Sequence, residues 1–177
     1  MRLRFNILDR EFLFVLEWRN KRKKDIVGYT SRTQDGKHII MMDYDFDKLE
    51  WIEDEIKALQ EDFKLGNAYI FKSNKGYHVV IPDKVAYGEL ITILKNSSVD
   101  PNHYYVPKMY GTQLITLRVS EKDGKKPQFI KEIKSKYNNN RKKSKAHIIF
   151  LNKIFNLNIP LENTDNYTKL ISAKYKI

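Results

Sequence analysis

Residues 37–47 read KHIIMMDYDFD, and they contain the clearest strand pattern in the chain. Its first half is a short apolar run that follows the turn signal Asp35-Gly36, a pattern typical of a buried central strand. The run ends in two carboxylates at alternate positions, Asp43 and Asp45. Because alternate side chains of a strand point to the same face, the sequence predicts two acids side by side at the end of a strand.

The segments around this strand predict a mixed α+β architecture. Apolar residues at spacings of three and four predict a helix over residues 49–63, with Asp47 as its N-cap. Two apolar runs, 68–72 and 77–82, flank a short Gly-containing turn and predict a hairpin. Further strands are expected over 2–8, 25–31 and 113–119 and a short helix over 87–94, whereas 11–18 is ambiguous between strand and helix.

From residue 125 onward the pattern becomes basic and helical. Phe129, Ile130, Ile133 and Tyr137 recur at helical spacing, which favours a helix with Phe129 in the core, and a second helix is expected over 146–155. The predicted fold class is therefore α+β, a mixed or antiparallel sheet with flanking helices and a helical basic C-terminal part. We expect a core over 1–124 and an extension over 125–177 packed on the same domain.

Composition restricts the classes of partner. A chain of 177 residues fits one domain, and its net charge of +11 attracts polyanions, of which nucleic acid is the commonest. The absence of cysteine excludes disulfides, thiolate zinc sites and cysteine nucleophiles. No apolar run is long enough to span a bilayer and the start does not resemble a signal peptide, so we expect a cytoplasmic (intracellular) protein without a membrane partner.

The paired acids predict a metal site. Asp43 and Asp45 cannot both stay ionised in a buried position without a counterion, and Mg²⁺ or Mn²⁺ would supply one. The alternative is a strand that runs out into a solvated acidic loop. Asp100, just before a proline, is the candidate third ligand or else an ordinary turn residue; Glu121 competes with it, and His103 is a less favoured partner.

A second group of residues predicts a phosphate site. In the sequence SNKGYH, Gly76 would let the backbone approach a phosphate, Lys75 would add a charge, and Ser73 and His78 would add hydrogen-bonding groups. The alternative is an ordinary hairpin with a lone, half-buried histidine.

Other basic residues suggest contacts with polyanions. Arg118 and Lys122 lie at the end of a predicted strand, where they would bind a triphosphate or else be solvated edge residues. Arg141, Lys142 and Lys143 lie in a basic stretch with nearby aromatic residues, a combination that suits nucleic acid, although the charges could also form a solvated face.

Taken in order, these pieces resemble the archaeo-eukaryotic primase superfamily. Asp43-Tyr44-Asp45 is similar to its Asp-x-Asp motif, and residues 73–78 are similar to its Ser-…-Gly-x-His turn, with a helix between the two. The resemblance covers residues 37–122. The apolar-apolar-Asp motif that carries the third acid in that family has no match after His78, so the role passes to Asp100.

The resemblance implies a primase-like (RRM-like) core and a metal-dependent primase or polymerase, as in small virus and plasmid members. Asp43, Asp45 and His78 would be catalytic, and the substrates would be nucleoside triphosphates and a single-stranded DNA template. A helicase or another replication protein is a possible partner. Two alternatives remain: a non-catalytic protein that binds single-stranded nucleic acid on a degenerate primase scaffold and, ranked third, a metal-dependent nuclease.

Overall fold

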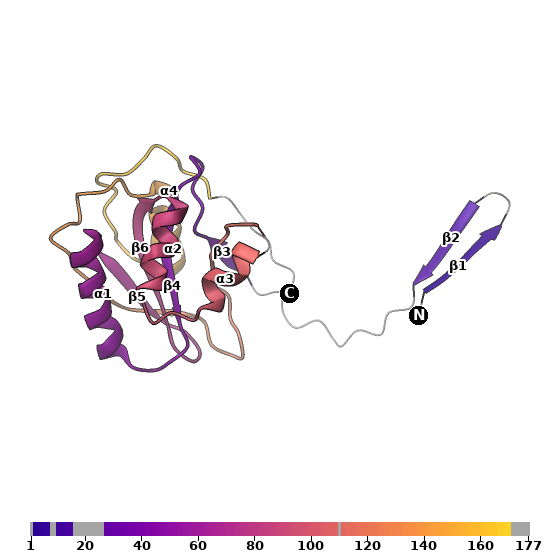
Figure 1. The fold of residues 1–177 in the computed structure, drawn as a ribbon, viewed down its shortest axis with the longest axis horizontal. Helices are drawn as coiled ribbons and strands as arrows, with labels where there is room; N and C mark the ends of the chain where they lie inside the picture. Colours follow the sequence, from indigo (N-terminus) through magenta and orange to yellow (C-terminus); the bar gives the residue numbers. More distant parts are fainter. Residues whose placement is uncertain (1, 8–9, 16–26, 110, 171–177) are drawn as a thin grey trace.

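The computed structural model describes residues 2–7, 10–15, 27–109 and 111–170. These residues form an α+β fold with antiparallel sheets and four helices (Figure 1). The predicted α+β class is thereby confirmed. None of the helices in the described ranges is both long and apolar enough to cross a membrane.

The central element is a four-stranded antiparallel sheet in the order β4–β6–β5–β8. β4 (His38–Tyr44) is the expected apolar strand, and β5 (Ala68–Lys72) and β6 (Tyr77–Val85) form the expected hairpin. β8 (Gln128–Ile133) adds the edge strand next to β5. The strand that carries Asp43 therefore lies at the opposite edge of this sheet from β8.

Two short ribbons complete the strands. β3 (Gly28–Thr30) pairs with β7 (Thr116–Arg118). Each of these strands has three residues and is shorter than the strand predicted from the sequence. β1 (Arg2–Ile7) and β2 (Arg10–Val15) form a separate hairpin, so residues 11–15 of the ambiguous apolar segment are strand, while residues 16–18 lie outside the described residues.

Three of the four helices are those expected from apolar spacing. They are α1 (Leu49–Phe63), α2 (Tyr87–Lys95) and α4 (Lys145–Phe155). The fourth, α3 (Asn102–Met109), was not predicted; it contains Pro107 and buries only Tyr104 among its residues. A helix with so few buried apolar residues carries little periodic signal in its sequence.

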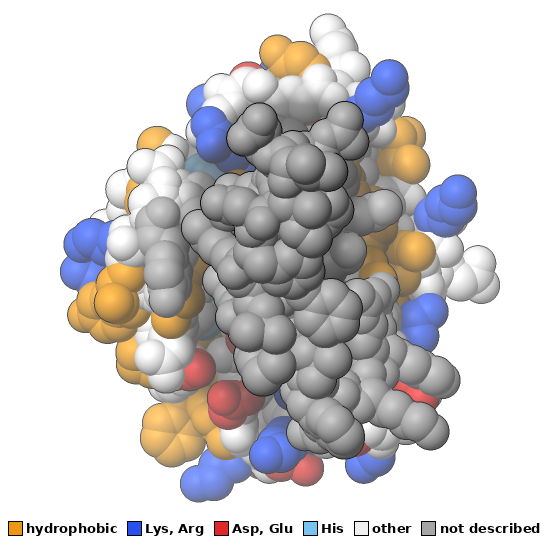
Figure 2. Space-filling model, turned by 90° about the vertical axis from the view of Figure 1, so that its right-hand side faces the viewer, with side chains coloured by type: hydrophobic (Ala, Val, Ile, Leu, Met, Phe, Trp, Pro, Cys, Tyr) orange, Lys and Arg blue, Asp and Glu red, His pale blue; other side chains and the backbone are white. Residues whose placement is uncertain are grey.

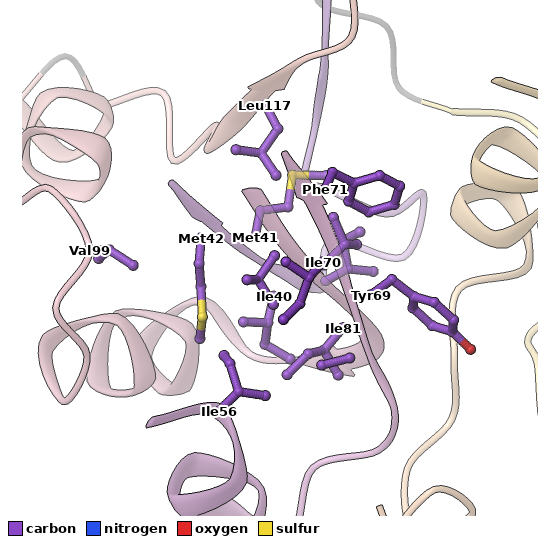
Figure 3. Packing of buried hydrophobic residues seen from close by; sticks show 14 of the residues in the cluster. Ile40, Met41, Met42, Ile56, Tyr69, Ile70, Phe71, Ile81, Val99 and Leu117 are labelled. Carbon is purple, nitrogen blue, oxygen red and sulfur yellow. The ribbon is translucent and has the colours of Figure 1, made fainter. Parts of the chain in front are cut away.

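The two faces of the central sheet pack against different helices. On one face Ile40, Met42 and Ile70 lie toward Ile56 of α1, as Figure 3 shows. Phe71 points to the other face, where its ring lies 4.3 Å from that of Phe155 in α4. Because both faces are covered, β4 is buried along almost its whole length, which explains its continuous apolar run.

The expected helix through residues 129–137 is wrong, because most of this segment is strand β8. Main-chain pairing with β5, with a bulge between Ile70 and Phe71, outweighs the helical spacing of its apolar residues. Phe129 is also not a core residue: it lies on an edge strand, 37% exposed, with its ring 5.8 Å from that of Phe71.

Asp47 does not cap α1. The N-cap residue is Lys48, without a side-chain capping bond, while the Asp47 carboxylate accepts hydrogen bonds from Lys72 Nζ at 2.6 Å and from the Tyr77 hydroxyl at 2.8 Å. Asp47 thus ties the start of α1 to the β5–β6 hairpin.

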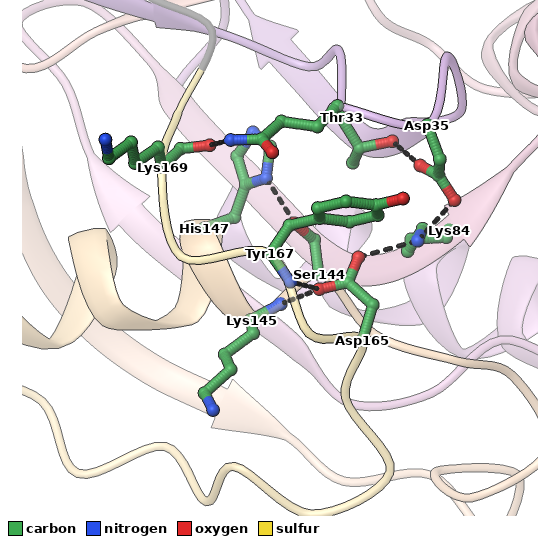
Figure 4. Close-up of polar contacts among 10 residues, drawn as sticks. Thr33, Asp35, Lys84, Ser144, Lys145, His147, Asp165, Tyr167 and Lys169 are labelled. Carbon is green, nitrogen blue, oxygen red and sulfur yellow. Dashed lines mark hydrogen bonds and ion pairs between the residues drawn. The ribbon is translucent and has the colours of Figure 1, made fainter.

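A buried ion pair holds the C-terminal segment against the sheet (Figure 4). Lys84 of β6 is 8% exposed, and its Nζ lies 2.6 Å from carboxylate oxygens of both Asp35 and Asp165. The second oxygen of Asp165 accepts from the backbone N–H groups of Lys145 and Tyr167. Residues far apart in the chain are therefore fixed at the end of the sheet where β4 begins.

Candidate functional site

Asp43 and His78 face each other across two neighbouring strands. They are direct Cα partners in the β4–β6 ladder, and His78 Nε2 lies 3.4 Å from Asp43 Oδ1. The Asp43 side chain is 37% exposed and that of His78 only 8%. Since directly paired residues share a face of the sheet, both side chains lie on the face opposite Met42 and α1.

Tyr44, between the two acids, explains why they alternate. Its ring is fully buried, and its hydroxyl donates to Glu55 of α1 at 2.7 Å. Glu55 also accepts from the backbone N–H and the hydroxyl of Ser98, at 3.0 and 2.5 Å. One carboxylate therefore binds both the end of β4 and the loop that leads to Asp100.

Asp100 lies beside Asp43. Its backbone N–H donates to the Asp43 carbonyl oxygen at 3.2 Å, and its carboxylate accepts from the backbone N–H of Asn102 at 3.0 Å. It therefore lies in the turn just before helix α3, as a turn residue would, and still lines the same cavity as the paired acids. His103, one turn further, donates from Nε2 to the Met41 carbonyl at 3.1 Å and fixes α3 against β4.

The β5–β6 turn needs a glycine because it passes close to β4. A Cβ atom on Gly76 would lie 1.7 Å from the Tyr44 carbonyl oxygen. The turn is closed by the Ser73 backbone N–H, which donates to the Gly76 carbonyl at 2.9 Å. Gly76 therefore accommodates a strand rather than lining the cavity, whereas Ser73 and Lys75 do line it.

Arg118 and Lys122 come from β7 and the turn that follows. Nη1 of Arg118 donates to the carbonyl oxygens of Ser120 and Lys125. Lys122 and Lys125 pair through their backbones around Asp123 and Gly124, whose φ angles of 55° and 79° match a type I′ turn. This turn directs Lys122 into the cavity.

These residues line one open cavity with a volume of about 710 Å³. That volume lies within the range of roughly 300–1,000 Å³ typical of small-molecule sites. Eight side chains predicted from the sequence meet here: Asp43, Asp45, Asp100, Ser73, Lys75, His78, Arg118 and Lys122.

Sequence reasoning missed the residues that α3 and the segment before β7 contribute to the cavity. They include Asn102, Val106, Pro107, Thr112 and Leu114, and His103, the less favoured candidate from the sequence, lines the cavity with them. The available signal was Asp100-Pro101, an acid followed by a proline directly before Asn102, because such a pair is common at a helix start as well as in a turn.

The electrostatics of the cavity favour a cation between the acids. Burial, followed by the charges of Asp45 and Asp100, raises the pKa of Asp43 to about 6, against the opposing effect of Arg118 and Lys122. Burial is also the main reason that the pKa of His78 falls to about 3, so its imidazole is neutral at pH 7. A neutral His78 does not neutralise Asp43.

The acids fit an ion that arrives with its substrate better than a closed protein cage. Within residues 27–109 and 111–170, no group of three or more acid or histidine side chains is close enough to hold a metal ion. Mg²⁺, however, commonly takes one or two carboxylates and completes its shell with water and substrate phosphates. The mutual repulsion of the acids around Asp43 is the feature that such an ion would relieve.

The basic stretch 141–143 lies outside the cavity lining, and two of its side chains serve the fold. Arg141 Nη2 lies 2.7 Å from a Glu89 oxygen and donates to the Phe63 carbonyl, and Lys143 is only 7% exposed. Lys142 is the exposed member. On the side shown in Figure 2, Lys and Arg side chains are spread around the described surface rather than gathered in one block.

No protein-family model, curated protein or solved structure matches the chain. What the cavity can do chemically therefore follows from its own side chains. Acids at the end of β4 can hold a divalent cation, and the lysines, the arginine and the serine can hold phosphate.

Proposed function

We propose that this protein is a metal-dependent nucleotidyltransferase of the primase or polymerase type that acts on a single-stranded DNA template. The observation that carries the proposal is the meeting of three carboxylates with phosphate-binding side chains in one cavity of nucleotide size. The antiparallel sheet with helices α1 and α2 on one face also supports the primase-like (RRM-like) core that the sequence resemblance implies.

One or two of the carboxylates of Asp43, Asp45 and Asp100 would hold the divalent cation, Mg²⁺ or Mn²⁺, and water and substrate phosphates would complete its shell. Such an ion lowers the pKa of an attacking hydroxyl and neutralises charge on the triphosphate. Asp43 must be ionised for this role, and Arg118 and Lys122 favour its ionised form. The hydrogen bond from the Asp100 backbone N–H to the Asp43 carbonyl oxygen holds the two acids next to each other.

The basic side of the cavity would bind the triphosphate. Lys75 and Lys122 supply point charges, and Arg118 presents a guanidinium whose Nη1 is already anchored to backbone carbonyls. His78, neutral at pH 7, can donate one ring N–H to a phosphate oxygen. Catalysis would then come from positioning and charge neutralisation by groups that are in place before the substrate binds.

The template would pass over the exposed lysines next to the cavity. Lys125 and Lys126 are exposed and follow Lys122 in the chain, whereas Arg141 and Lys143 are engaged in the fold. Lysines that contact a nucleic-acid backbone release counterions and make binding salt-dependent. A helicase or another replication protein would be the protein partner of this activity.

The proposal is tested by incorporation of labelled nucleotides on single-stranded DNA, with and without a primer, in Mg²⁺ and in Mn²⁺. We expect Asp43→Asn and Asp45→Asn each to reduce incorporation at least about 100-fold without loss of fold. The control is Asp54→Asn, an exposed acid of α1 on the other side of the sheet. Full activity in either site variant, or no incorporation by folded wild-type protein, would contradict the proposal.

The second candidate is a non-catalytic protein that binds single-stranded nucleic acid. It is favoured by the finding that no three metal-ligating side chains are already gathered in the described part of the chain. Thermal denaturation separates the two candidates, because a ligand at 100 times its dissociation constant adds about 2.7 kcal/mol of stability. A shift with single-stranded DNA but none with Mn²⁺ and nucleotide would support this second function.

A further inference from the structure

One wall of the cavity is apolar and has no part in the metal or phosphate chemistry proposed above. It consists of Val106 and Pro107 of α3 and Leu114 in the segment before β7. Val106 is 43% exposed, although it lies in a cavity rather than on a convex surface. Ligand sites commonly combine such apolar walls with a few polar groups that set orientation.

The apolar wall and the phosphate-binding turn lie on opposite sides of the acids. β4 is at one edge of the sheet, and α3 is bonded to it through His103 and Met41. The turn with Ser73 and Lys75 joins β5 to β6, further into the sheet. Asp43 on β4 therefore lies between the wall and the turn.

The wall is fixed before any ligand binds. α3 is held to β4 at its start, where the Asp100 backbone N–H donates to Asp43. Beyond its other end, Thr112 donates from its backbone N–H and its hydroxyl to the Pro107 carbonyl, at 3.1 and 3.3 Å. These bonds set where Pro107 and Leu114 lie relative to the acids, and such pre-organisation lowers the cost of binding.

We propose that Val106, Pro107 and Leu114 form the seat of the nucleobase of the bound nucleoside triphosphate. The inference rests on the proposed function: with the triphosphate at the basic turn and the metal at the acids, the nucleoside extends toward α3. Apolar side chains contact the face of a base without reading its hydrogen-bonding edge. The seat therefore accepts all four bases and leaves their selection to the template.

The test compares two ligands that share the phosphate chain. Binding of dATP and of inorganic tripolyphosphate is measured by calorimetry in Mn²⁺ for the full chain and for Val106→Asn and Leu114→Asn. We expect wild-type protein to bind dATP about tenfold more tightly than tripolyphosphate. A difference of this size corresponds to the burial of about one valine-sized apolar contact. Each variant should remove this advantage, and dATP, dCTP, dGTP and dTTP should bind wild-type protein within about threefold of one another.

The matched control is Met109→Asn. Met109 is on the same helix, is 79% exposed and lies outside the set of residues that line the cavity, so its variant should keep the tenfold preference. Unchanged tripolyphosphate affinity in the Val106 and Leu114 variants would show that both remain folded with an intact phosphate site.

The outcomes distinguish this inference from the function on which it rests. If wild-type protein binds both ligands equally, or if both cavity variants keep the preference for dATP, the nucleobase seat is wrong while the phosphate site stands. If wild-type protein binds neither ligand in Mn²⁺, the proposed function fails and the seat fails with it.

Discussion

The backbone N–H of Asp100 donates to the carbonyl oxygen of Asp43 across 3.2 Å, and this bond joins two acids that are far apart in the sequence. The loop that carries Asp100 is held from behind the sheet, where Glu55 accepts from Ser98 and from Tyr44. The position of the third acid thus depends on a side chain on the far face of the sheet from the cavity.

We expect Glu55→Ala to lower both stability and nucleotide incorporation. The substitution removes the partners of the buried Tyr44 hydroxyl and of Ser98, which should cost about 2 kcal/mol in the free energy of unfolding. Urea denaturation and the incorporation assay measure the two effects. Asp54→Ala is the control, since its partner is the exposed Lys57; equal effects of the two substitutions would contradict the role given to Glu55.

Gly76→Ala should be severely destabilising. The added Cβ would lie 1.7 Å from the Tyr44 carbonyl oxygen, so the turn or the end of β4 must move, at an expected cost of about 3 kcal/mol or more. Gly88→Ala is the matched control: its Cβ meets nothing within 4 Å, and alanine in α2 should add about 0.5–1 kcal/mol. A Gly76→Ala variant with wild-type stability would show that this close approach does not exist.

The stability of the protein should depend on the ionisation of Asp83. Burial raises the pKa of this residue to about 6, against the effects of a hydrogen bond from the Gly66 N–H and the charges of Lys143 and Arg141. A raised pKa in the folded state means that the native protein holds its proton more tightly than the unfolded chain. The contribution of Asp83 to stability is therefore largest below about pH 4 and is lost as the pH rises toward 6.

Asp83→Asn should remove this loss. The amide oxygen can still accept from Gly66, so the variant should gain of the order of 2 kcal/mol over wild type at pH 7.5 and little at pH 4. Denaturation curves at several pH values measure the difference. A gap between the two proteins that does not change with pH would contradict the assignment.

Lys125 and Lys126 should contribute to the salt dependence of binding to single-stranded DNA. If each contacts one phosphate, the double variant Lys125→Ala/Lys126→Ala should reduce the slope of log affinity against log salt by about 1.4. Fluorescence anisotropy with a labelled oligonucleotide measures this slope. Lys57→Ala, an exposed lysine of α1 paired with Asp54, should leave it unchanged, and an equal reduction there would mean that binding is not localised beside the cavity.

The elements with strong periodic patterns could be predicted from the sequence. The apolar run before Asp43, the stripe of α1 and the β5–β6 hairpin all have the predicted form, because each places its apolar residues in the core. The residues predicted on the ends of these elements meet in one cavity for the same reason. Where local pattern and burial agree, the sequence is sufficient.

The errors occur where a long-range contact decides the structure. Phe129 and Ile133 have helical spacing but lie on a strand because β5 offers an unpaired edge. Val106 and Pro107 gave no helical signal because they line a cavity instead of entering the core. Asp47 precedes a helix but pairs with Lys72, since the hairpin brings that lysine within 2.6 Å.

The bonds that fix α3 to β4 also determine how the cavity responds to a ligand. The acids and α3 are bonded to β4, and the β3–β7 ribbon brings Arg118 to the same cavity. The ribbon is anchored as well, because Tyr29 and Leu117 are buried and the Thr30 carbonyl accepts a hydrogen bond from His147 of α4. A ligand should therefore enter a cavity whose walls already have their bound shape, and most of the entropy of ordering these side chains is lost when the chain folds and not when the ligand binds.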